Sequence, residues 1–473
     1  MRRAGLGAAA LLAGAFLSWG CAGPAPSSGP SEDPSVLRPC DQVRLPFLDE
    51  ASAEPLQELH AHCFNFMLER EGARPVPVQV VLLSDREADP LEGRQLLVYH
   101  PGGPSVSATR LMLGDPPPVD YQRYSVLAWD GFTARAAIGG CGPESLAFLT
   151  ERTPQDFAQR APRVTSECVG GYDSPLELGA WAAAEELETV RRMIGTDRFD
   201  MLAISYGTAI AEAYLHMHPE RVRHAVLDGP LALEVSWPNR LTAVGPVLGR
   251  LADELARSCR TDACQSVLSE AGAGGSYDAL RAAVLAEDRP VGSGTLLLRP
   301  VMFDQATALA LRGRDYWPGW ATAVDEALAG DGTLMWRIGE RLLEDLDRDN
   351  FYWSLCADID RPLDAAGYAG GPHPLLFAYA SELAPCAGFP KGVSRPAGTA
   401  GQAAAVLILA SRHDVLAPAA LLSWSPRLQA LGSACITDVV GHTSYRDEAL
   451  RPVVEEFLAT GDVGVMAEQC DFQ

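Results

Sequence analysis

The chain has 473 residues, about three times the length of a typical domain, so it is long enough to bury a large hydrophobic core. Hydrophobic residues make up 47% of the sequence and charged residues 21%, which excludes collagen-like, coiled-coil and broadly disordered chains and indicates a soluble globular protein. Asp and Glu number 61 against 38 Lys and Arg, and the net charge of −23 repels nucleic acid and offers no basic face to anionic lipid. We therefore expect no nucleic-acid partner.

The first residues have the pattern of an export signal. Arg2 and Arg3 precede an uncharged apolar run, Ala4 to Trp19, which is shorter than the roughly 20 residues of a membrane-spanning helix. We predict a signal peptide at residues 1–20. The run ends in Leu17-Ser-Trp-Gly-Cys21, which resembles a bacterial lipoprotein box, so Cys21 is the predicted lipidation site; ordinary signal cleavage is the alternative.

Residues 21–38 are rich in Pro, Ser and Gly and are predicted to form a flexible tether. The mature protein would then be held by a lipid at a membrane, facing the periplasm or the cell exterior, or it would be secreted if no lipid is attached. The membrane is an expected partner only through this anchor.

Cysteine content agrees with export. Of eleven cysteines, ten remain when Cys21 is set aside, and an even number in an exported chain indicates up to five disulfides. Many connectivities are open, but the cysteines fall into neighbouring couples along the chain. These couples predict the pairs Cys40–Cys63, Cys141–Cys168, Cys259–Cys264, Cys356–Cys386 and Cys435–Cys470. No C-x-x-C occurs, so we expect neither a zinc ribbon nor any other metal site.

Apolar runs of strand length alternate with stretches of helical spacing. A helix is predicted at residues 178–194, with Gly195 as its C-terminal stop. Buried strands are predicted at residues 95–99, 124–129, 199–204, 224–227 and 404–410. This alternation is typical of a mainly parallel sheet with helices on both faces.

The strand signal fades between residues 231 and 395. Five tryptophans lie there among helical patterns: Trp237, Trp317, Trp320, Trp336 and Trp353. We predict that residues 231–395 form a mainly helical cap inserted into the sheet domain. The core then consists of residues 39–230 and 396–473.

Ser205 lies in the sequence Ala203-Ile-Ser-Tyr-Gly207, between a predicted strand and a helix-prone stretch. Small residues two places before and after such a serine are typical of a nucleophile elbow, which presents the hydroxyl on a strained turn. The alternative is an ordinary strand-to-helix turn in which Ser205 caps the helix.

A nucleophilic serine needs a histidine base that a carboxylate orients. Asp414 follows the predicted strand at 404–410, and His442 follows a later apolar run at residues 435–440. The order Ser205, Asp414, His442 is that of an α/β-hydrolase triad.

Other residues compete for two of these roles. Asp228 also follows a predicted strand, although Asp228-Gly-Pro230 is equally typical of a turn. His413 is next to Asp414 in sequence, while His216 and His218 lie two apart on a predicted helix and do not share a face. We expect surface or core positions for these three histidines.

An acyl-transfer site also needs N–H donors for the oxyanion. The N–H of Tyr206 is one expected donor, because it follows the nucleophile. The loop His100-Pro-Gly-Gly-Pro104 follows the first predicted strand, and we choose Gly103 as the second donor, with Gly102 as its rival. A Gly-rich turn without this role is the alternative. The loop contains no phosphate-binding pattern.

These residues resemble the exported tripeptidyl-aminopeptidase and proline-iminopeptidase-like branch of the α/β-hydrolases, a family of serine peptidases. Pro101-Gly-Gly-Pro104 is similar to its oxyanion loop, and Ser205-Tyr-Gly-Thr208 to its elbow. Further similar segments lie at residues 186–191, 221–229, 355–358 and 385–390. The sequence departs from the family pattern at Ser105, at Ala203 and at residues 130–135, which bears on substrate choice more than on catalysis.

The resemblance implies an aminopeptidase that releases short peptides or single residues from free N-termini through an acyl-enzyme on Ser205, with no cofactor. An acidic group in the cap would pair with the substrate ammonium, and Asp358 is a candidate, with a structural role as its alternative. The same triad would also serve a hydrolase of carboxylic esters or other small acyl compounds. A binding protein that retains the fold without activity is a third possibility.

Overall fold

The structure is a computed structural model of the chain. It describes residues 37–43, 59–69, 75–104, 106–131, 141–151, 156–169, 179–271, 276–344, 348–359, 373–392, 404–462 and 470–472. The predicted signal peptide, Cys21, nearly all of the predicted tether, Ser105, residues 132–135 and the predicted boundary at 395 lie outside these ranges. None of the helices in the described ranges is both long enough and apolar enough to cross a membrane.

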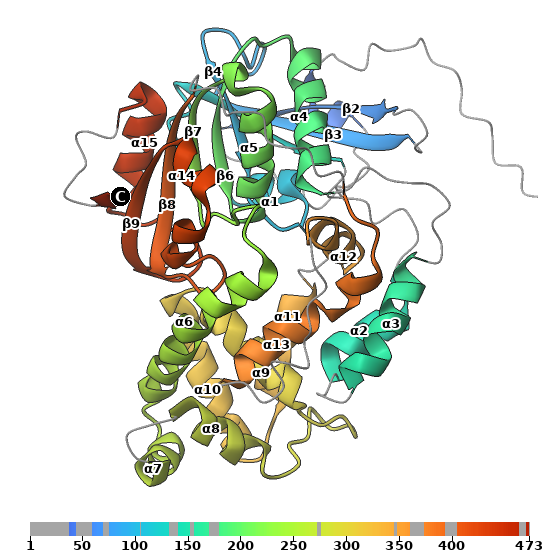
Figure 1. Ribbon diagram of the computed structural model, residues 1–473, viewed down its shortest axis with the longest axis vertical. Coiled ribbons are helices and arrows are strands. Elements are labelled where there is room, and N and C mark those ends of the chain that lie inside the picture. The colour runs from blue at the N-terminus through green and yellow to red at the C-terminus, as the bar shows by residue number, and fades with distance from the viewer. Residues whose placement is uncertain are drawn as a thin grey trace, which may run out of the picture. The chain divides into compact units, whose positions relative to one another are not determined.

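A sheet in the order β1-β2-β3-β5-β4-β6-β7-β8-β9-β10 forms the centre of the described chain (Figure 1). The strands are β1 (Arg38–Pro39), β2 (His60–Leu68), β3 (Val76–Ser84), β4 (Gln95–His100), β5 (Tyr124–Asp130), β6 (Phe199–Ile204), β7 (Val222–Asp228), β8 (Ala405–His413), β9 (Ser433–Val440) and β10 (Asp471–Phe472). Neighbours from β5 through β9 are parallel, whereas β1 to β3 and β10 join the sheet antiparallel. All five predicted strands lie in the parallel part.

The central strands are continuous apolar runs because both faces of the sheet are covered. Successive side chains of β4 show this: Leu96 and Val98 belong to one hydrophobic cluster, while Leu97 and Tyr99 belong to the other. Each face therefore has its own core.

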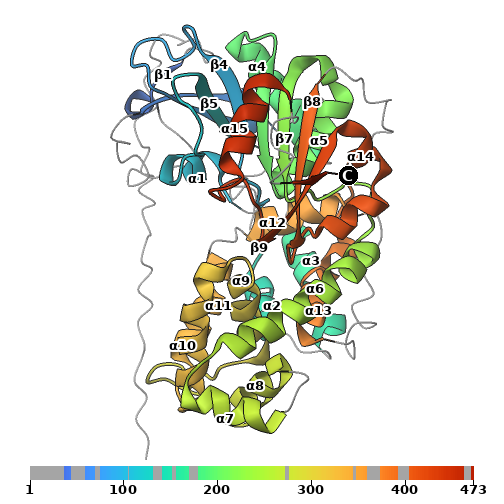
Figure 2. The same cartoon turned by 90° about the vertical axis from the view of Figure 1, so that its left-hand side faces the viewer.

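Helices cover each face of the sheet. They are α1 (Ala108–Gly114), α4 (Ala180–Ile194), α5 (Tyr206–Met217), α14 (Pro426–Leu431) and α15 (Arg451–Thr460). The buried residues of α4 and α5 pack in one cluster and those of α1 and α15 in the other (Figure 2). Helix α4 ends at Gly195, whose φ of 78° is left-handed, as predicted.

Between residues 231 and 392 the regular secondary structure of the described chain is helical, apart from two isolated bridges, Pro290 with Leu297 and Gly313 with Gly441. The helices are α6 (Trp237–Ser258), α7 (Asp262–Ala271), α8 (Ser276–Leu285), α9 (Pro300–Ala310), α10 (Trp317–Leu328), α11 (Thr333–Glu344), α12 (Arg348–Ala357) and α13 (Pro374–Glu382), followed by a short 3-10 helix η7 (Ala384–Gly388). We call these helices the cap. Trp320 is fully buried among them, and its indole N–H donates to Thr307 Oγ1 at 3.0 Å.

Two further helices pack on the cap although they precede Ser205 in sequence: α2 (Pro143–Glu151) and α3 (Asp156–Val169). Gln305 Nε2 on α9 donates to the carbonyl of Leu149 at 3.1 Å, and Thr165 Oγ1 donates to the carbonyl of Pro385 at 2.6 Å. The sequence analysis assigned these residues to the core, because a helix that packs on a distant segment has no local signal for its partner. The helical layer is therefore built from two separate segments of the chain.

The described residues form five disulfides, in the pairs that the cysteine couples predict: Cys40–Cys63, Cys141–Cys168, Cys259–Cys264, Cys356–Cys386 and Cys435–Cys470. Two of them hold short strands to the sheet, at β1 and at β10. Three join neighbouring helices, including α12 and η7. Disulfides of this number are typical of proteins that fold in an oxidising compartment.

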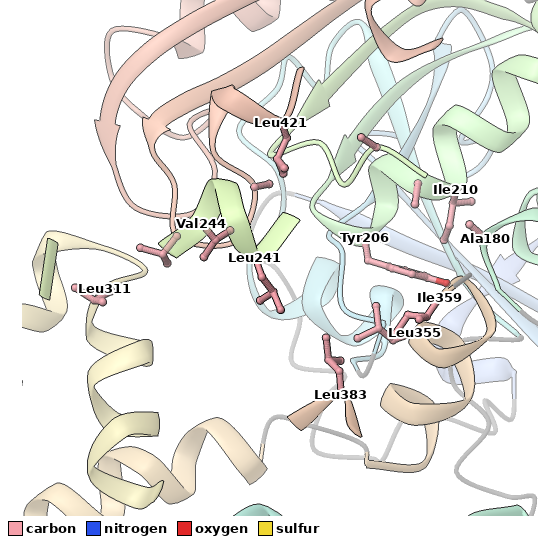
Figure 3. Close-up of a cluster of buried hydrophobic side chains, with 14 of the residues drawn as sticks. Ala180, Tyr206, Ile210, Leu241, Val244, Leu311, Leu355, Ile359, Leu383 and Leu421 are labelled. Atoms are coloured by element: carbon pink, nitrogen blue, oxygen red, sulfur yellow. The ribbon is translucent and has the colours of Figure 1, made fainter. Parts of the chain in front are cut away.

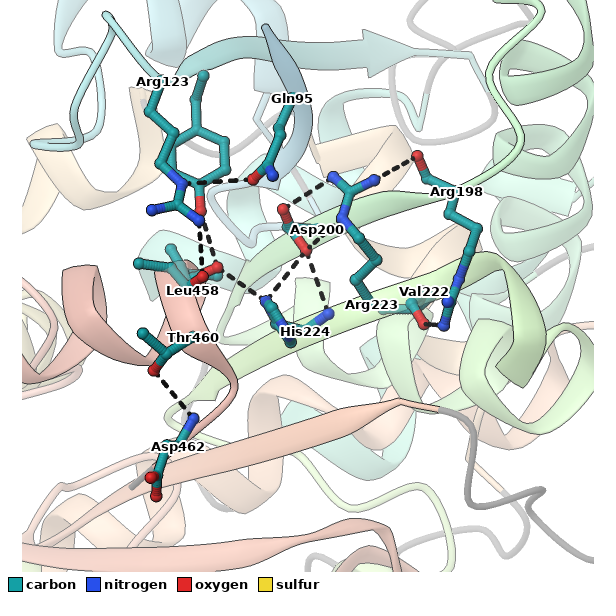
Figure 4. A network of polar contacts seen from close by, with 12 residues as sticks. Gln95, Arg123, Arg198, Asp200, Val222, Arg223, His224, Leu458, Thr460 and Asp462 are labelled. Atoms are coloured by element: carbon teal, nitrogen blue, oxygen red, sulfur yellow. Dashed lines mark hydrogen bonds and ion pairs between the residues drawn. The ribbon is translucent and has the colours of Figure 1, made fainter. Parts of the chain in front are cut away.

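A polar network holds α15 at the amino ends of the strands (Figure 4). Asp200, at the start of β6, is fully buried and forms an ion pair with Arg223 at 2.9 Å. His224 Nδ1 bonds the carbonyl of Leu458 at 2.8 Å, and Arg123 donates to the carbonyl of Ala459 at 2.6 Å. Ser205 lies beyond the other end of β6.

Candidate active site

Ser205 occupies the turn between β6 and α5 with φ 52° and ψ −122°, a conformation that non-glycine residues rarely adopt. Its N–H donates to the carbonyl of Asp228 at 2.8 Å. A Cβ at Gly207 would lie 2.7 Å from the carbonyl oxygen of His100, so only glycine fits there. Both observations are the geometry that the predicted nucleophile elbow requires.

Asp414 and His442 come together from loops at the carboxyl ends of β8 and β9. His442 Nδ1 lies 2.9 Å from Asp414 Oδ2 and 3.1 Å from Oδ1. Asp414 is buried, and its Oδ1 also accepts hydrogen bonds from the N–H groups of Leu416 at 2.7 Å and Ala417 at 2.9 Å. When the ring of His442 is neutral, this pairing places Nδ1–H toward the carboxylate and leaves Nε2 as an acceptor.

Electrostatics keep Asp414 ionised. Burial acts to raise the pKa of this carboxyl, but the charge and hydrogen bond of His442 and the N–H groups of Ala417 and Leu416 outweigh it and hold the pKa below its usual value. His442 Nε2 is buried, and no atom of the described residues hydrogen-bonds it. The nitrogen that would act as base is therefore available, and Ser205 and His442 are not joined by a direct hydrogen bond in this structure.

The histidine loop also contacts the cap. The N–H of His442 donates to the carbonyl of Arg312 at 3.0 Å, and Gly441 pairs with Gly313 in an isolated bridge. Gly441 has a φ of 132°, and a Cβ there would collide with the carbonyl of Arg312. The sequence analysis missed this contact because Arg312 lies far from His442 along the chain.

The loop after β4 contains two glycines, and Gly102 lies beside the serine. A Cβ at Gly102 would lie 2.8 Å from Ser205 Cβ, so the loop approaches the elbow closely. The N–H of Gly102 donates to His100 Nδ1 at 3.2 Å, while the N–H of Gly103 has no acceptor among the described residues. Burial lowers the pKa of His100 to about 4, so its ring is neutral and accepts this bond. The N–H of Gly102 is thus engaged within its own loop, and the choice of Gly103 as the second oxyanion donor stays a prediction.

Tyr206 opens helix α5, where the first N–H groups have no partner within the helix. Its backbone N–H thus remains available beside Ser205. Its hydroxyl donates to Asp358 Oδ2 at 2.6 Å, and burial, together with the Asp358 charge, raises the pKa of Tyr206 well above its usual value. The N–H of Ala180, at the start of α4, donates to Asp358 Oδ1 at 3.1 Å. Asp358 is thus engaged in structural contacts, the alternative to its predicted role with a substrate ammonium.

The rival residues occupy other positions. Asp228 Oδ2 accepts hydrogen bonds from the N–H groups of Ser444 at 2.6 Å and Tyr445 at 2.8 Å, whereas Asp414 holds the His442 ring. His413 contacts Arg250 Nη1 at 2.9 Å. The other two histidines make different contacts: His216, on α5, stacks on Trp181, and His218, just after α5, packs against Tyr214.

Buried apolar side chains surround Tyr206 and come from both the core and the cap (Figure 3). Leu355 and Ile359, on and just after α12, lie beside its ring, and Leu383 lies just before η7. Leu241 and Val244 are on α6, near Leu421 of the loop after β8. A buried apolar cluster therefore joins the residue after Ser205 to the cap.

Comparison with known proteins gives one family match and distant relatives. Residues 150–322 match the family model described as alpha/beta hydrolase fold. The proteins named serine protease Hip1 of Mycobacterium tuberculosis and Mycobacterium bovis are 28% identical over 149 residues, 28% of this chain and 29% of theirs. The chain thus spans less than a third of the length of these relatives.

Solved structures overlap it over more of its length. A serine hydrolase of Cycloclasticus zankles has 12% identity and a TM-score of 0.33, covering 84% of this chain and 98% of that one. Carboxylesterase CesB of Bacillus subtilis has 12% identity and a TM-score of 0.34, covering 85% and 92%. The strand order, the elbow after β6 and the family match at residues 150–322 together identify the chain as a protein of the α/β-hydrolase fold.

Proposed function

We propose that the protein is an exported serine hydrolase with Ser205, His442 and Asp414 as its catalytic triad. The observation that carries this proposal is the pairing of buried Asp414 with His442 Nδ1 at 2.9 Å, in loops at the same edge of the sheet as the Ser205 elbow. This order of serine, acid and histidine after successive strands supports the α/β-hydrolase mechanism.

In this mechanism Ser205 Oγ attacks the substrate carbonyl as its proton passes to His442 Nε2. The N–H groups of Tyr206 and Gly103 stabilise the negative oxygen of the tetrahedral intermediate. His442 then gives its proton to the leaving group, which departs and leaves an acyl-enzyme on Ser205. Water, activated by His442, releases the acyl group and restores the serine. Every step uses groups of this chain, so no cofactor is needed.

We propose that the substrates are peptides with free N-termini, from which the enzyme releases short peptides or single residues. The resemblance of the oxyanion loop and the elbow to exported aminopeptidases supports this choice, as does the partial match to proteins named serine protease.

Export is part of the proposal. Five disulfides in the structure are typical of an oxidising compartment. The predicted signal peptide would lead the chain there, and a lipid on Cys21 would hold it at the membrane. Mass spectrometry of the mature N-terminus tests this: a diacylglyceryl cysteine as the first residue supports the anchor, and an unmodified N-terminus contradicts it.

The peptidase proposal is tested with a peptide mixture of which half is N-acetylated. We expect mass spectrometry to show stepwise loss of residues from free amino ends only. Ser205→Ala is the matched control, and we expect it to lower turnover about a million-fold. Activity within about tenfold of the wild type in that variant contradicts the assignment of Ser205.

If neither half of the mixture is cut, the aminopeptidase proposal is wrong, and a panel of carboxylic esters separates the remaining possibilities. Ester cleavage that Ser205→Ala abolishes identifies an acyl-ester hydrolase with the same triad. Absence of both activities, together with no labelling by an organophosphonate, identifies a binding protein.

A further inference from the structure

Ser205 and His442 belong to different loops and share no hydrogen bond in this structure, so other groups must set the distance between them. Ser205 follows β6, and His442 follows β9, which lies three strands away in the sheet. Asp228, at the end of β7, is in contact with both loops. The triad mechanism does not use its carboxylate.

The main chain of Asp228 sits at the centre of this edge of the sheet. It pairs with Ile204 of β6 on one side and with Leu409 of β8 on the other. Its carbonyl accepts the N–H of Ser205 at 2.8 Å, which is the hydrogen bond that supports the strained elbow. The backbone of Asp228 therefore fixes the position of Ser205 relative to β8, the strand that leads to Asp414.

The side chain of Asp228 reaches the histidine loop. Oδ2 accepts the N–H groups of Ser444 at 2.6 Å and Tyr445 at 2.8 Å, two and three residues after His442. Oδ1 is buried and has no hydrogen-bond partner among the described residues. A single carboxylate oxygen thus anchors the loop.

The neighbouring residue shows how close this anchor is to the catalytic groups. A Cβ at Gly229 would lie 3.0 Å from His442 Cε1 and 3.4 Å from Asp414 Oδ2. Thr443, between His442 and the anchored N–H groups, has a φ of 81°, an unfavourable conformation for a β-branched residue. The hydrogen bonds to Asp228 hold the loop in this conformation.

We propose that Asp228 is a positioning residue of the proposed hydrolase, which aligns His442 Nε2 with Ser205 Oγ by binding both loops at once. The inference rests on the proposed serine hydrolase function. It predicts that the hydrogen-bonding oxygen matters and that the negative charge does not. Asp228→Asn keeps one oxygen for the two N–H groups, whereas Asp228→Ala leaves both without an acceptor.

The experiment measures labelling of Ser205 by an organophosphonate, which reports on the nucleophile without knowledge of the natural substrate. The second-order rate constant and the final number of labels per molecule are determined for the wild type, Asp228→Asn, Asp228→Ala and Asp228→Ser. We expect the Asn variant within about tenfold of the wild-type rate and the Ala variant slower by about a hundredfold or more, with full final labelling in both. The Ser variant replaces Ala if the latter does not fold, because its hydroxyl is too short to reach both N–H groups.

Asp200→Asn is the matched control. Asp200 is also a buried carboxylate near a strand end and forms an ion pair with Arg223, but it lies at the opposite end of β6 (Figure 4). We expect this variant to lose stability because Arg223 loses its charged partner, and to label at the wild-type rate. Loss of stability alone therefore does not slow labelling.

Each outcome has a distinct meaning. If Asp228→Ala is labelled at the wild-type rate, the inference is wrong. It is also wrong if Asp228→Asn is labelled as slowly as Asp228→Ala, because the effect would then come from the lost negative charge. A normal rate with incomplete final labelling would indicate a merely structural role and also overturns it. If the wild type itself is not labelled, the proposed function fails instead.

Discussion

The hydroxyl of Tyr206 donates a hydrogen bond to Asp358 at 2.6 Å, and this contact joins the residue after Ser205 to the end of cap helix α12. Because the backbone N–H of Tyr206 is a proposed oxyanion donor, Tyr206 belongs to the proposed oxyanion site through its backbone and contacts the cap through its side chain. A displacement of α12 would therefore move the Tyr206 N–H relative to the carbonyl of the bound substrate.

We predict that Tyr206→Phe lowers kcat about tenfold with little change in KM, because the variant loosens a group that acts in the transition state. Asp358→Ala should lower kcat further, since it also releases the N–H of Ala180. Steady-state kinetics of the two single variants and the double variant form a double-mutant cycle. Additive effects would show that the two residues act independently and contradict this prediction.

Substitution of Gly102 should inactivate the protein. A Cβ there would lie 2.8 Å from Ser205 Cβ and 2.9 Å from the carbonyl oxygen of Ile204, so Gly102→Ala must displace the elbow. We expect phosphonate labelling to slow by about a hundredfold or more.

Gly93→Ala is the control for the effect of backbone conformation alone. Gly93 also has a positive φ, of 68°, but a Cβ there would meet no atom within 4 Å. This variant should lose about 1 kcal/mol of unfolding free energy and keep its labelling rate. Equal loss of activity in both glycine variants would contradict the close-approach explanation.

Asp414→Asn should lower kcat about ten-thousandfold while the fold is kept. The amide would present an N–H to His442 Nδ1 or hold the ring in the wrong tautomer, so Nε2 would no longer accept the serine proton. Activity and thermal unfolding are measured together. A variant that retains activity within about tenfold would show that another carboxylate orients the histidine. Asp228, the rival acid in the sequence analysis, would be the first candidate.

Glu212, on α5, should make stability depend on pH. Burial raises the pKa of this carboxyl from 4.5 to about 7, although the N–H of Leu233 partly offsets the effect. Between these values the unfolded chain is ionised and the folded chain is protonated, so the free energy of unfolding falls as the pH rises from 4.5 to 7. We predict that Glu212→Gln is more stable than the wild type by up to about 3 kcal/mol at pH 8, with no gain at pH 4.5.

Urea unfolding at several pH values between 4.5 and 8 measures this difference. Glu188→Gln is the matched control of opposite sign. Burial acts to raise the pKa of Glu188, but hydrogen bonds from Arg191, Tyr214 and Arg192 outweigh it and lower the pKa to about 2. Its ionised form is therefore stabilised in the folded chain, and the Gln variant should be less stable throughout this range. A Glu212→Gln gain that does not grow with pH would contradict the assigned cause.

The sequence predicted the centre of the molecule because local patterns carry the information. Apolar runs mark β4 to β8, since strands covered on both faces bury side chains on each face. The Ser205 elbow has its own local pattern, in which Gly207 must be small because His100 passes beside it. The cysteine couples predicted the disulfides because each cysteine pairs with the next one along the chain, at most 35 residues away.

The features of the fold and the site that the sequence did not predict depend on contacts between distant segments. β3 contains Pro77 and Gln79, and its antiparallel pairing with β2 has no signal in the local sequence. Likewise, no local pattern predicts that the backbone carbonyl of Arg312 accepts a hydrogen bond from the N–H of His442. Asp228 was considered as an acid because of its place after a strand, and only the fold reveals that its oxygen binds the histidine loop.

The division of the cap between two chain segments limits how this protein can exchange parts with its relatives. Transplanting residues 231–395 into another hydrolase would leave behind α2 and α3, whose buried Leu149 and Val164 belong to the same cluster as the cap helices. The recipient would then expose an apolar face and lose the bonds from Gln305 to Leu149 and from Thr165 to Pro385. A working chimera must therefore carry residues 141–169 along with the insertion. These two segments, one before and one after Ser205 in the sequence, have to be transferred together.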